Sequence, residues 1–271
     1  VGDFNGQEMN RTTYNLARMN MILHGVHYRN FDLRQEDTLE HPQHVDKRFE
    51  AVVANPPFSA KWSANPLLLN DDRYSQYGRL APASKADFAF VQHMLHQLDD
   101  NGTMAVILPH GVLFRAGTEG AIRKAFIEHD LVEGVIGVAP NLFYGAGIPA
   151  AILLLRKHKP EHMRGKVMIV NGAEQFEEGR AQNYLRDEHI KTLSEAYLTF
   201  DDVERLAAVV STSDIAANDY NLNITRYVNL SEAAEQLDVA MEVERLMALV
   251  AERDAAEAKM TQHLRELGYV E

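Results

Sequence analysis

The sequence RFEAVVANPPFSAKW, from Arg48 to Trp62, is the stretch that decides the fold. Its first seven residues are rich in apolar and β-branched side chains, which predicts a buried strand. Asn55, Pro56, Pro57 and Phe58 end that strand, because proline cannot continue a central strand. Asn-Pro often begins a turn, so the four residues have a purely structural explanation. They also form a candidate site, because open α/β sheets bind ligands beside the carboxyl ends of their strands.

Outward from this stretch, segments typical of helices alternate with segments typical of strands. Leu16, Met19 and Leu23 recur at helical spacing, which predicts an amphipathic helix. Residues 59–83 are polar and irregular, and we expect a long loop there. The alternation predicts an α/β fold with a largely parallel sheet. The predicted helices cover residues 10–25, 84–102 and 119–129, and the predicted strands cover residues 48–54, 103–109, 131–138, 147–157 and 166–172.

Two end signals support the helix predicted at residues 84–102. Ser84, with Asp87 three positions later, resembles a capping box at the start of the helix. Asn101-Gly102 resembles a stop at its end.

The sequence changes character after about Ala173, and we expect three parts. Residues 1–172 form the core, residues 173–230 a polar helical connector, and residues 231–271 a helical arm. In the last part, apolar residues at spacings of three and four alternate with Glu and Arg. This pattern fits a helix packed on its own domain, but its length favours a coiled-coil or bundle arm for a partner.

The composition is that of a globular protein, with 46% hydrophobic and 24% charged residues among 271. The absence of cysteine excludes disulfides and thiolate chemistry and fits a reducing cytoplasm. No apolar run approaches the length of a membrane span, and the scattered histidines predict no metal site. The net charge of −12 disfavours a stand-alone DNA binder, so any grip on DNA should come largely from a partner.

The chemistry of the candidate site follows from its acceptors. The side chain of Asn55 offers a carbonyl oxygen, and the prolines fix the backbone so that the Pro56 carbonyl is held rigidly. Two converging acceptors suit a planar amine with two N–H donors, such as the exocyclic amine of adenine. The Phe58 ring can stack on the base, which must first leave a duplex.

These motifs resemble those of the modification (M) subunits of type I restriction–modification systems, which are N6-adenine DNA methyltransferases. The resemblance covers Asn5 to about Val228. It implies a Rossmann-like methyltransferase sheet that uses S-adenosylmethionine (AdoMet), with a C-terminal helical extension and the activity EC 2.1.1.72. The matching motifs, in family order, are GQEMNRTTYNLARMNMILHG, EDTL, NPPFSAKW, KADFAFVQHML, GTMAVILPHGVLFRAG, NLFYGAGIPAAILLLRK and NDYNLNITRYV.

The resemblance also implies roles for single residues. Glu8 matches the acidic residue that binds the AdoMet ribose, and Asp37 matches the contact to the cofactor adenine. Asn55 and the Pro56 carbonyl match the acceptors for the target amine, with Asn55 also bordering the cofactor. Phe58 and Phe143 match the target-base pocket. Each carboxylate has a plainer alternative, since Glu8 precedes a helix and Asp37 lies in a turn sequence.

One part of the family pattern is missing from the sequence. The Gly-rich AdoMet loop lies upstream of GQE in this family, and neither Gly2 nor Gly6 follows a predicted strand. The opening residues are typical of the middle of a domain, and the family's N-terminal helical domain is also absent. We therefore expect this chain to be inactive alone.

The resemblance implies several partners and leaves two other functions open. The partners are DNA, a specificity (S) subunit, a second M subunit and a restriction (R) subunit, in the cytoplasm of a bacterium or archaeon and with no membrane. One alternative is amide N-methylation of protein glutamine, although that class typically has Tyr where this chain has Phe58. The other is a non-catalytic scaffold.

Overall fold

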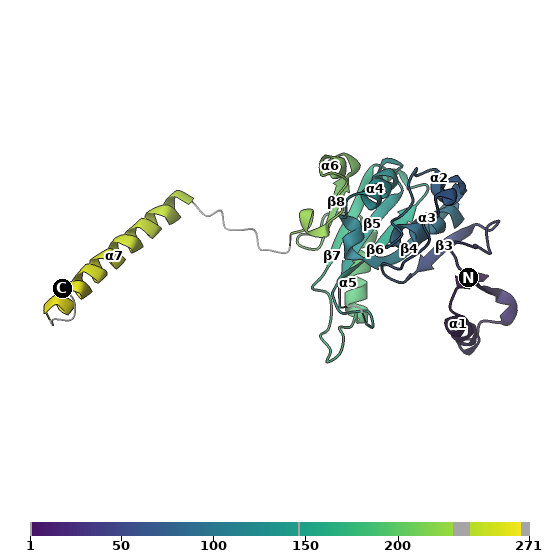
Figure 1. The fold of residues 1–271 in the computed structure, drawn as a ribbon, viewed down its shortest axis with the longest axis horizontal. Helices are drawn as coiled ribbons and strands as arrows, with labels where there is room; N and C mark the ends of the chain where they lie inside the picture. The colour runs from purple at the N-terminus through teal and green to yellow at the C-terminus, as the bar shows by residue number, and fades with distance from the viewer. Residues whose placement is uncertain (1, 146, 230–238, 267–271) are drawn as a thin grey trace. The chain divides into compact units, whose positions relative to one another are not determined.

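The computed structural model describes residues 2–145, 147–229 and 239–266 (Figure 1). The chain divides into two compact units, Val1–Leu230 and Ser231–Glu271, and each is described by itself.

The first unit is built on a six-stranded sheet with the order β3-β4-β6-β5-β7-β8. Helices cover both of its faces (Figure 1). The strands are β3 (Phe49–Ala54), β4 (Leu98–Pro109), β5 (Val132–Val138), β6 (Ala150–Arg156), β7 (Lys166–Gly172) and β8 (Ala207–Ser211).

The prediction of a largely parallel sheet is wrong, because the sheet is mixed. β3 pairs in parallel with β4, and β5 with β7, but β6 runs antiparallel to both of its neighbours. The described residues of the connection from β5 to β6 contain no α-helix, so they lack the crossover that a parallel return requires. β8 is also antiparallel to its neighbour, β7.

Two hydrophobic clusters hold the helices on opposite faces of this sheet. On β7, Val167 and Ile169 belong to one cluster, whereas Met168 and Val170 belong to the other, as the alternation of a strand requires. The first cluster takes side chains from α3 (Asp87–Gln97) and α4 (Thr118–Glu128), and the second from α5 (Asp187–Thr199). The core therefore lies on both sides of the sheet.

A second, two-stranded sheet precedes the main one. β1 (Phe4–Glu8) and β2 (Phe31–Gln35) pair in parallel, joined by α1 (Arg11–Leu23). Within the described residues, no strand pairing joins this small sheet to β3. Val53 on β3 is 77% exposed, although it is an apolar residue of a strand in the main sheet.

Several predicted details differ in the structure. The apolar stripe of α1 is exposed, with Leu16, Met19 and Leu23 at least 59% accessible, and the helix has no buried residue. The capping-box prediction is wrong, because α3 begins after Ala86 and has no side-chain cap. The stop signal at Asn101-Gly102 is also wrong, since both residues lie within β4.

The segments predicted to be a loop and a helix are each more varied than expected. Residues 59–83 contain two short helices, and Arg73 and Tyr74 in the second are buried. Residues 173–210, predicted to be helical, contain α5 and also most of strand β8. The remaining short elements are η1 (Tyr28–Asn30), η2 (Pro66–Asn70), α2 (Asp72–Ser75), η3 (His110–Leu113), η4 (Glu161–Met163), α6 (Thr212–Ala217) and η5 (Ile224–Arg226).

The second unit contains one long helix, α7 (Val239–Glu266), of 28 residues. Its exposed large apolar side chains include Leu246, Met247, Leu249, Val250 and Met260. The apolar stripe predicted from the sequence consists of Ala233, Leu237, Ala240, Val243, Met247 and Val250. Met247 and Val250 are among these exposed side chains, and Ala233 and Leu237 lie outside the described residues. No helix in the described part of the chain combines the length and apolar character needed to cross a membrane.

Candidate active site

Asn55, Pro56, Pro57 and Phe58 directly follow β3, where the sequence places them at a strand's carboxyl end. Asn55 and Pro57 are exposed, Pro56 is buried and Phe58 is partly buried. The next residue, Ser59, has a φ of 51°, in the left-handed region that a non-glycine residue adopts only when its surroundings hold it there. The turn is therefore held by contacts outside itself.

Those contacts come from the start of α3. Ser59 donates from its backbone N–H to Asp87 Oδ1 at 2.7 Å and from its hydroxyl to Asp87 Oδ2 at 3.3 Å. Asp87 is 1% exposed and also receives Arg115 Nη1 at 3.3 Å. Its carboxylate lies in the first turn of α3, where negative charge is favoured. The residue predicted to complete a capping box thus anchors the turn that follows Phe58.

Phe58 and Phe143 are brought together from positions 85 residues apart. Their ring centroids lie 6.0 Å apart with an interplanar angle of 74°, an edge-to-face contact. Phe143 lies in the connection between β5 and β6. A flat base can stack on either ring, but entry between the two requires one of them to move.

A cavity of about 390 Å³ connects the ends of three strands. Glu8 at the end of β1, Asp37 just after β2, and the Asn55-Pro56-Pro57 turn after β3 all line it. Its volume lies in the range of small-molecule sites. Among the described residues, its lining does not include Phe58 or Phe143. The structure therefore brings five of the seven predicted residues to one cavity and pairs the other two with each other.

The plainer alternatives for the two carboxylates are also observed. Glu8 Oε1 accepts from the backbone N–H of Asn10, the N-cap of α1, at 2.7 Å. Asp37 Oδ1 accepts from the N–H groups of Leu39 at 2.8 Å and Glu40 at 3.2 Å, which makes it a turn-forming residue. An ionised carboxylate has about four acceptor sites, so each group can form these bonds and still receive a ligand.

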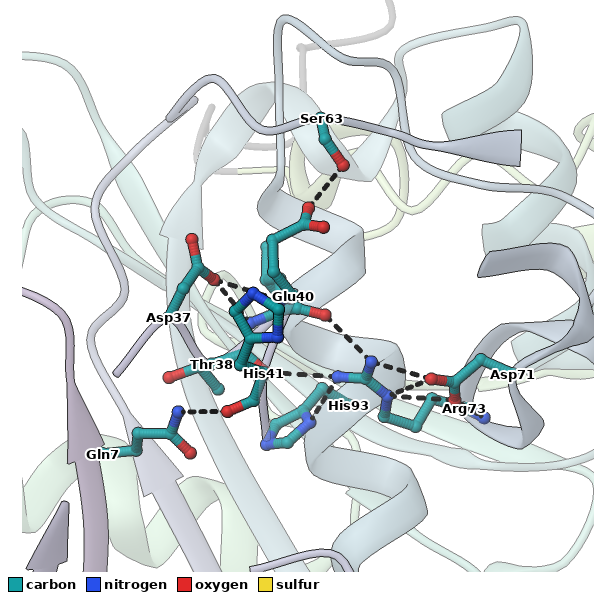
Figure 2. A network of polar contacts seen from close by, with 10 residues as sticks. Gln7, Asp37, Thr38, Glu40, His41, Ser63, Asp71, Arg73 and His93 are labelled. Carbon is teal, nitrogen blue, oxygen red and sulfur yellow. Dashed lines mark hydrogen bonds and ion pairs between the residues drawn. The ribbon is translucent and has the colours of Figure 1, made fainter. Parts of the chain in front are cut away.

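The loop that carries Asp37 is tied to the rest of the site from two sides (Figure 2). Gln7, next to Glu8, donates to the His41 carbonyl and accepts from the Gln43 N–H, each at 2.9 Å. From the other side, Arg73 donates to the carbonyls of Thr38 and Leu39.

His93 on α3 also lines the cavity and is 6% exposed. Burial, with a further contribution from the neighbouring Arg73 charge, lowers its pKa to about 3. Its Nδ1 lies 3.3 Å from Arg73 Nη1. Arginine can only donate, so His93 accepts there and its ring is neutral.

Four further residues of this site were not predicted from the sequence: Asp87, Arg73, His93 and Gln7. Asp87 carried a signal, since an acidic residue opened a predicted helix. Gln7 and His93 lie inside the motifs GQEMNRTTYNLARMNMILHG and KADFAFVQHML but were given no role there, and Arg73 is a single polar residue with no motif around it.

No group of three or more His, Asp or Glu residues suited to a metal ion occurs in the part of the chain that the structure describes.

Comparisons with known proteins agree in one family. The family model described as N-6 DNA Methylase matches residues 2–236. The methylase subunit of the type I restriction enzyme MpnII from Mycoplasma pneumoniae is 36% identical over 244 residues, covering 86% of this chain and 45% of that protein. The MjaVII methylase subunit from Methanocaldococcus jannaschii is 34% identical over 276 residues, covering 98% and 46%. The chain thus spans about half the length of these curated relatives.

Solved structures share the fold. The type I restriction-modification system methyltransferase subunit from Streptococcus thermophilus has a TM-score of 0.80 at 45% identity, covering 84% of this chain and 48% of that one. The type I restriction enzyme EcoKI M protein has a TM-score of 0.63 at 18% identity, covering 95% of this chain and 60% of that one, a likeness of fold alone.

Proposed function

The chain belongs to the N-6 DNA methylase family, and we propose that its full-length parent transfers a methyl group from AdoMet to N6 of a flipped-out adenine in DNA. The activity corresponds to EC 2.1.1.72. The observation that carries this proposal is the single cavity lined by Glu8, Asp37 and the Asn55-Pro56-Pro57 turn. The family match does not favour glutamine amide methylation or a scaffold role.

Asn55 and Pro56 activate the target amine. The N6 lone pair is delocalised into the adenine ring, so the amine is a poor nucleophile. Acceptors on both N–H groups favour a pyramidal nitrogen and stabilise the positive charge that develops as it attacks, an effect of about 3–4 kcal/mol per group. Transfer forms the N6–carbon bond and breaks the sulfur–methyl bond, whose electron pair stays on sulfur, and one N6 proton passes to water. Phe58, with Phe143 against it, supplies the stacking surface for the base.

The residues around the cavity fit one side of AdoMet. When bound, this cofactor supplies an electrophilic methyl group on a sulfonium sulfur. The Glu8 carboxylate can accept from two ribose hydroxyls, and Asp37 can accept from the cofactor's adenine amine. Asn55 borders both the cofactor cavity and the target amine, so it fixes one relative to the other.

We further propose that this chain is inactive by itself. β1 and β3 both present unpaired edges within the described residues, and the same cavity reaches both strands. A strand from the rest of the parent protein, ending in a Gly-rich turn, would join the two sheets and form the remaining wall around the cofactor.

Tritiated AdoMet and DNA test the main proposal, with the full-length parent assembled with its specificity subunit. After digestion to nucleosides, we expect the label on adenine N6 with the wild type and its loss with Asn55→Ala. Asn65→Ala is a matched control, because Asn65 caps η2 in the same connecting segment without lining the cavity. Label on another base or on protein glutamine would contradict the proposal.

The helix α7 is proposed to pack on helices of the specificity subunit, within a complex that also contains a second M subunit and a restriction subunit. At about 1.5 Å per residue it extends about 42 Å, and Leu246, Leu249 and Val250 lie on one side at spacings of three and four. The specificity subunit would supply the grip on DNA that a chain of net charge −12 lacks. This complex acts in the cytoplasm of a bacterium or archaeon.

Deletion of residues 231–271 tests the arm by copurification with the specificity subunit. We expect copurification to be lost on deletion and on changing Leu246, Leu249 and Val250 to serine. Changing the exposed residues Ala251, Ala258 and Lys259, on the opposite side of the helix, to serine is the control and should leave it intact. Unchanged assembly after the deletion would refute the proposal.

A further inference from the structure

Arg73 is a buried cation in a segment that the sequence marks only as polar. It lies on α2, between the Asn55–Phe58 turn and α3, and is 3% exposed. A buried charge costs several kcal/mol unless it is paired and its donors are satisfied. Its position therefore needs an explanation in its contacts.

All three guanidinium nitrogens of Arg73 have partners (Figure 2). Nε donates to Asp71 Oδ1 at 3.0 Å, and Nη2 donates to Asp71 Oδ2 at 2.8 Å, a bidentate pair. Nη1 donates to the carbonyl of Thr38 at 3.1 Å, and Nη2 to the carbonyl of Leu39 at 2.9 Å. The neutral His93 ring accepts from Nη1 on the remaining side. Asp71 thus neutralises the charge, and the two terminal nitrogens of the guanidinium donate to two successive backbone carbonyls.

Those two carbonyls belong to the residues that follow Asp37. Leu39 donates its N–H to Asp37 Oδ1 and gives its carbonyl to Arg73, so one residue connects the guanidinium to the carboxylate. On the opposite side, Gln7 holds the same loop next to Glu8. Ser63 also donates to the Glu40 carboxylate from the segment that follows the acceptor turn. Among the described residues that hold this loop by hydrogen bonds, Arg73 is the one that is both buried and charged.

We propose that Arg73 is a positioning residue for the AdoMet adenine, which acts through Thr38 and Leu39 to hold Asp37 against the cavity. The inference rests on the proposed function, because it takes Asp37 as the contact to the cofactor's adenine. The planar guanidinium suits this task better than the ammonium group of lysine, since its several N–H donors reach two carbonyls and a carboxylate at once. It also links the cofactor loop to the segment that follows Phe58.

The test is AdoMet affinity, measured by equilibrium binding on the full-length parent assembled with its specificity subunit. We expect Arg73→Met to raise the AdoMet Kd by about tenfold or more, and Asp37→Ala to raise it by a similar factor. Because both changes remove the same contact, the double variant should bind no more weakly than the weaker single variant. Factors that multiply in the double variant would overturn the proposal.

Arg123→Met is the matched control for burial and charge. Arg123 is 4% exposed and donates to the backbone carbonyls of Val112, Arg115 and Tyr220, and it does not line the cavity. We expect it to lower the melting temperature about as much as Arg73→Met and to leave the AdoMet Kd unchanged. An equal loss of AdoMet affinity in both variants would mean that Arg73 is only structural.

Arg73→Lys keeps the test decisive if Arg73→Met does not fold. Lysine retains the charge beside Asp71 but cannot reach both carbonyls, so an intermediate AdoMet Kd is expected in a folded protein. A wild-type Kd in Arg73→Lys, with Arg73→Met unfolded, would overturn the proposal. If the wild type itself does not bind AdoMet, the proposed function fails; if the wild type and Arg73→Met bind it equally, only this inference fails.

Discussion

Protonation of His93 is expected to destabilise the fold as the pH falls, and His93→Gln should remove that effect. The ring accepts from Arg73 and is buried, so its pKa in the folded state is about 3, against 6.5 for the ordinary side chain. The unfolded chain therefore binds the proton more readily. The stability contributed by the neutral ring is fully present above about pH 6.5 and is lost progressively as the pH falls towards about 3.

The magnitude follows from the two pKa values. The linkage relation gives a loss of about 1 kcal/mol at about pH 6 and about 2 kcal/mol at about pH 5, relative to about pH 8. Burial also lowers the pKa of His96 and His110, so the wild type should lose more than this in total. His93→Gln isolates one residue, because the amide oxygen can accept from Arg73 without taking up a proton.

Urea unfolding of the 271-residue chain at several pH values measures the effect. Trp62 is the single tryptophan and contacts the Tyr74 ring at a centroid distance of 5.8 Å, so its fluorescence reports from beside Arg73. Relative to His93→Gln, the wild type should lose about 2 kcal/mol of unfolding free energy from about pH 8 to about pH 5. A difference that stays constant would refute the reasoning. So would an NMR signal assigned to the His93 imidazole that titrates near 6.5.

Three further substitutions test other parts of the account. Asp87→Asn removes the charge that holds the turn after Phe58 and should lower the unfolding free energy by about 1–3 kcal/mol in urea; a change below about 0.5 kcal/mol would show that the anchor is unimportant. Phe58→Leu should weaken binding of an extrahelical base by about 1–3 kcal/mol, read from 2-aminopurine fluorescence at the target position, and equal fluorescence would argue against stacking. Glu133→Gln removes the buried charge that pairs with the partly exposed Arg156 and accepts from Tyr197, and should cost about 1–3 kcal/mol in thermal unfolding, whereas an unchanged melting temperature would contradict that pairing.

The sequence predicted the parts of the fold that depend on local pattern. β3, β5, β6 and β7 lie where apolar, β-branched runs placed them, and Asn55 to Phe58 follow β3 as expected. The cavity that joins Glu8, Asp37 and Asn55 was implied by family motifs rather than by spacing, because these residues are far apart along the chain.

The errors came from contacts between distant segments. The antiparallel direction of β6 depends on its insertion between β4 and β5, and local periodicity carries no information on that pairing. The capping box at Ser84 failed because Asp87 is used by Ser59 instead. The amphipathic helix predicted over residues 10–25 forms as α1, but its apolar stripe is exposed, because nothing in the described residues covers it.

Arg73 and His93 show why the rest of the site could not be predicted. Arg73 lies in a polar stretch with no distinctive pattern, and His93 lies in a helical motif that assigns it no role; each acquires its role from a partner at least 20 residues away. A polar segment that buries a charged residue looks the same in sequence as one that exposes it. Only the three-dimensional contacts distinguish the two cases.

The most direct test of the central claim is the single-turnover rate of methyl transfer at saturating AdoMet, in the full-length parent with its specificity subunit and target DNA. If Asn55 polarises the N6 amine, Asn55→Ala should lower this rate by about 10²–10³-fold, while Asn65→Ala leaves it unchanged. A rate for Asn55→Ala within about threefold of the wild type would contradict the account, because the amine would then react without its acceptor.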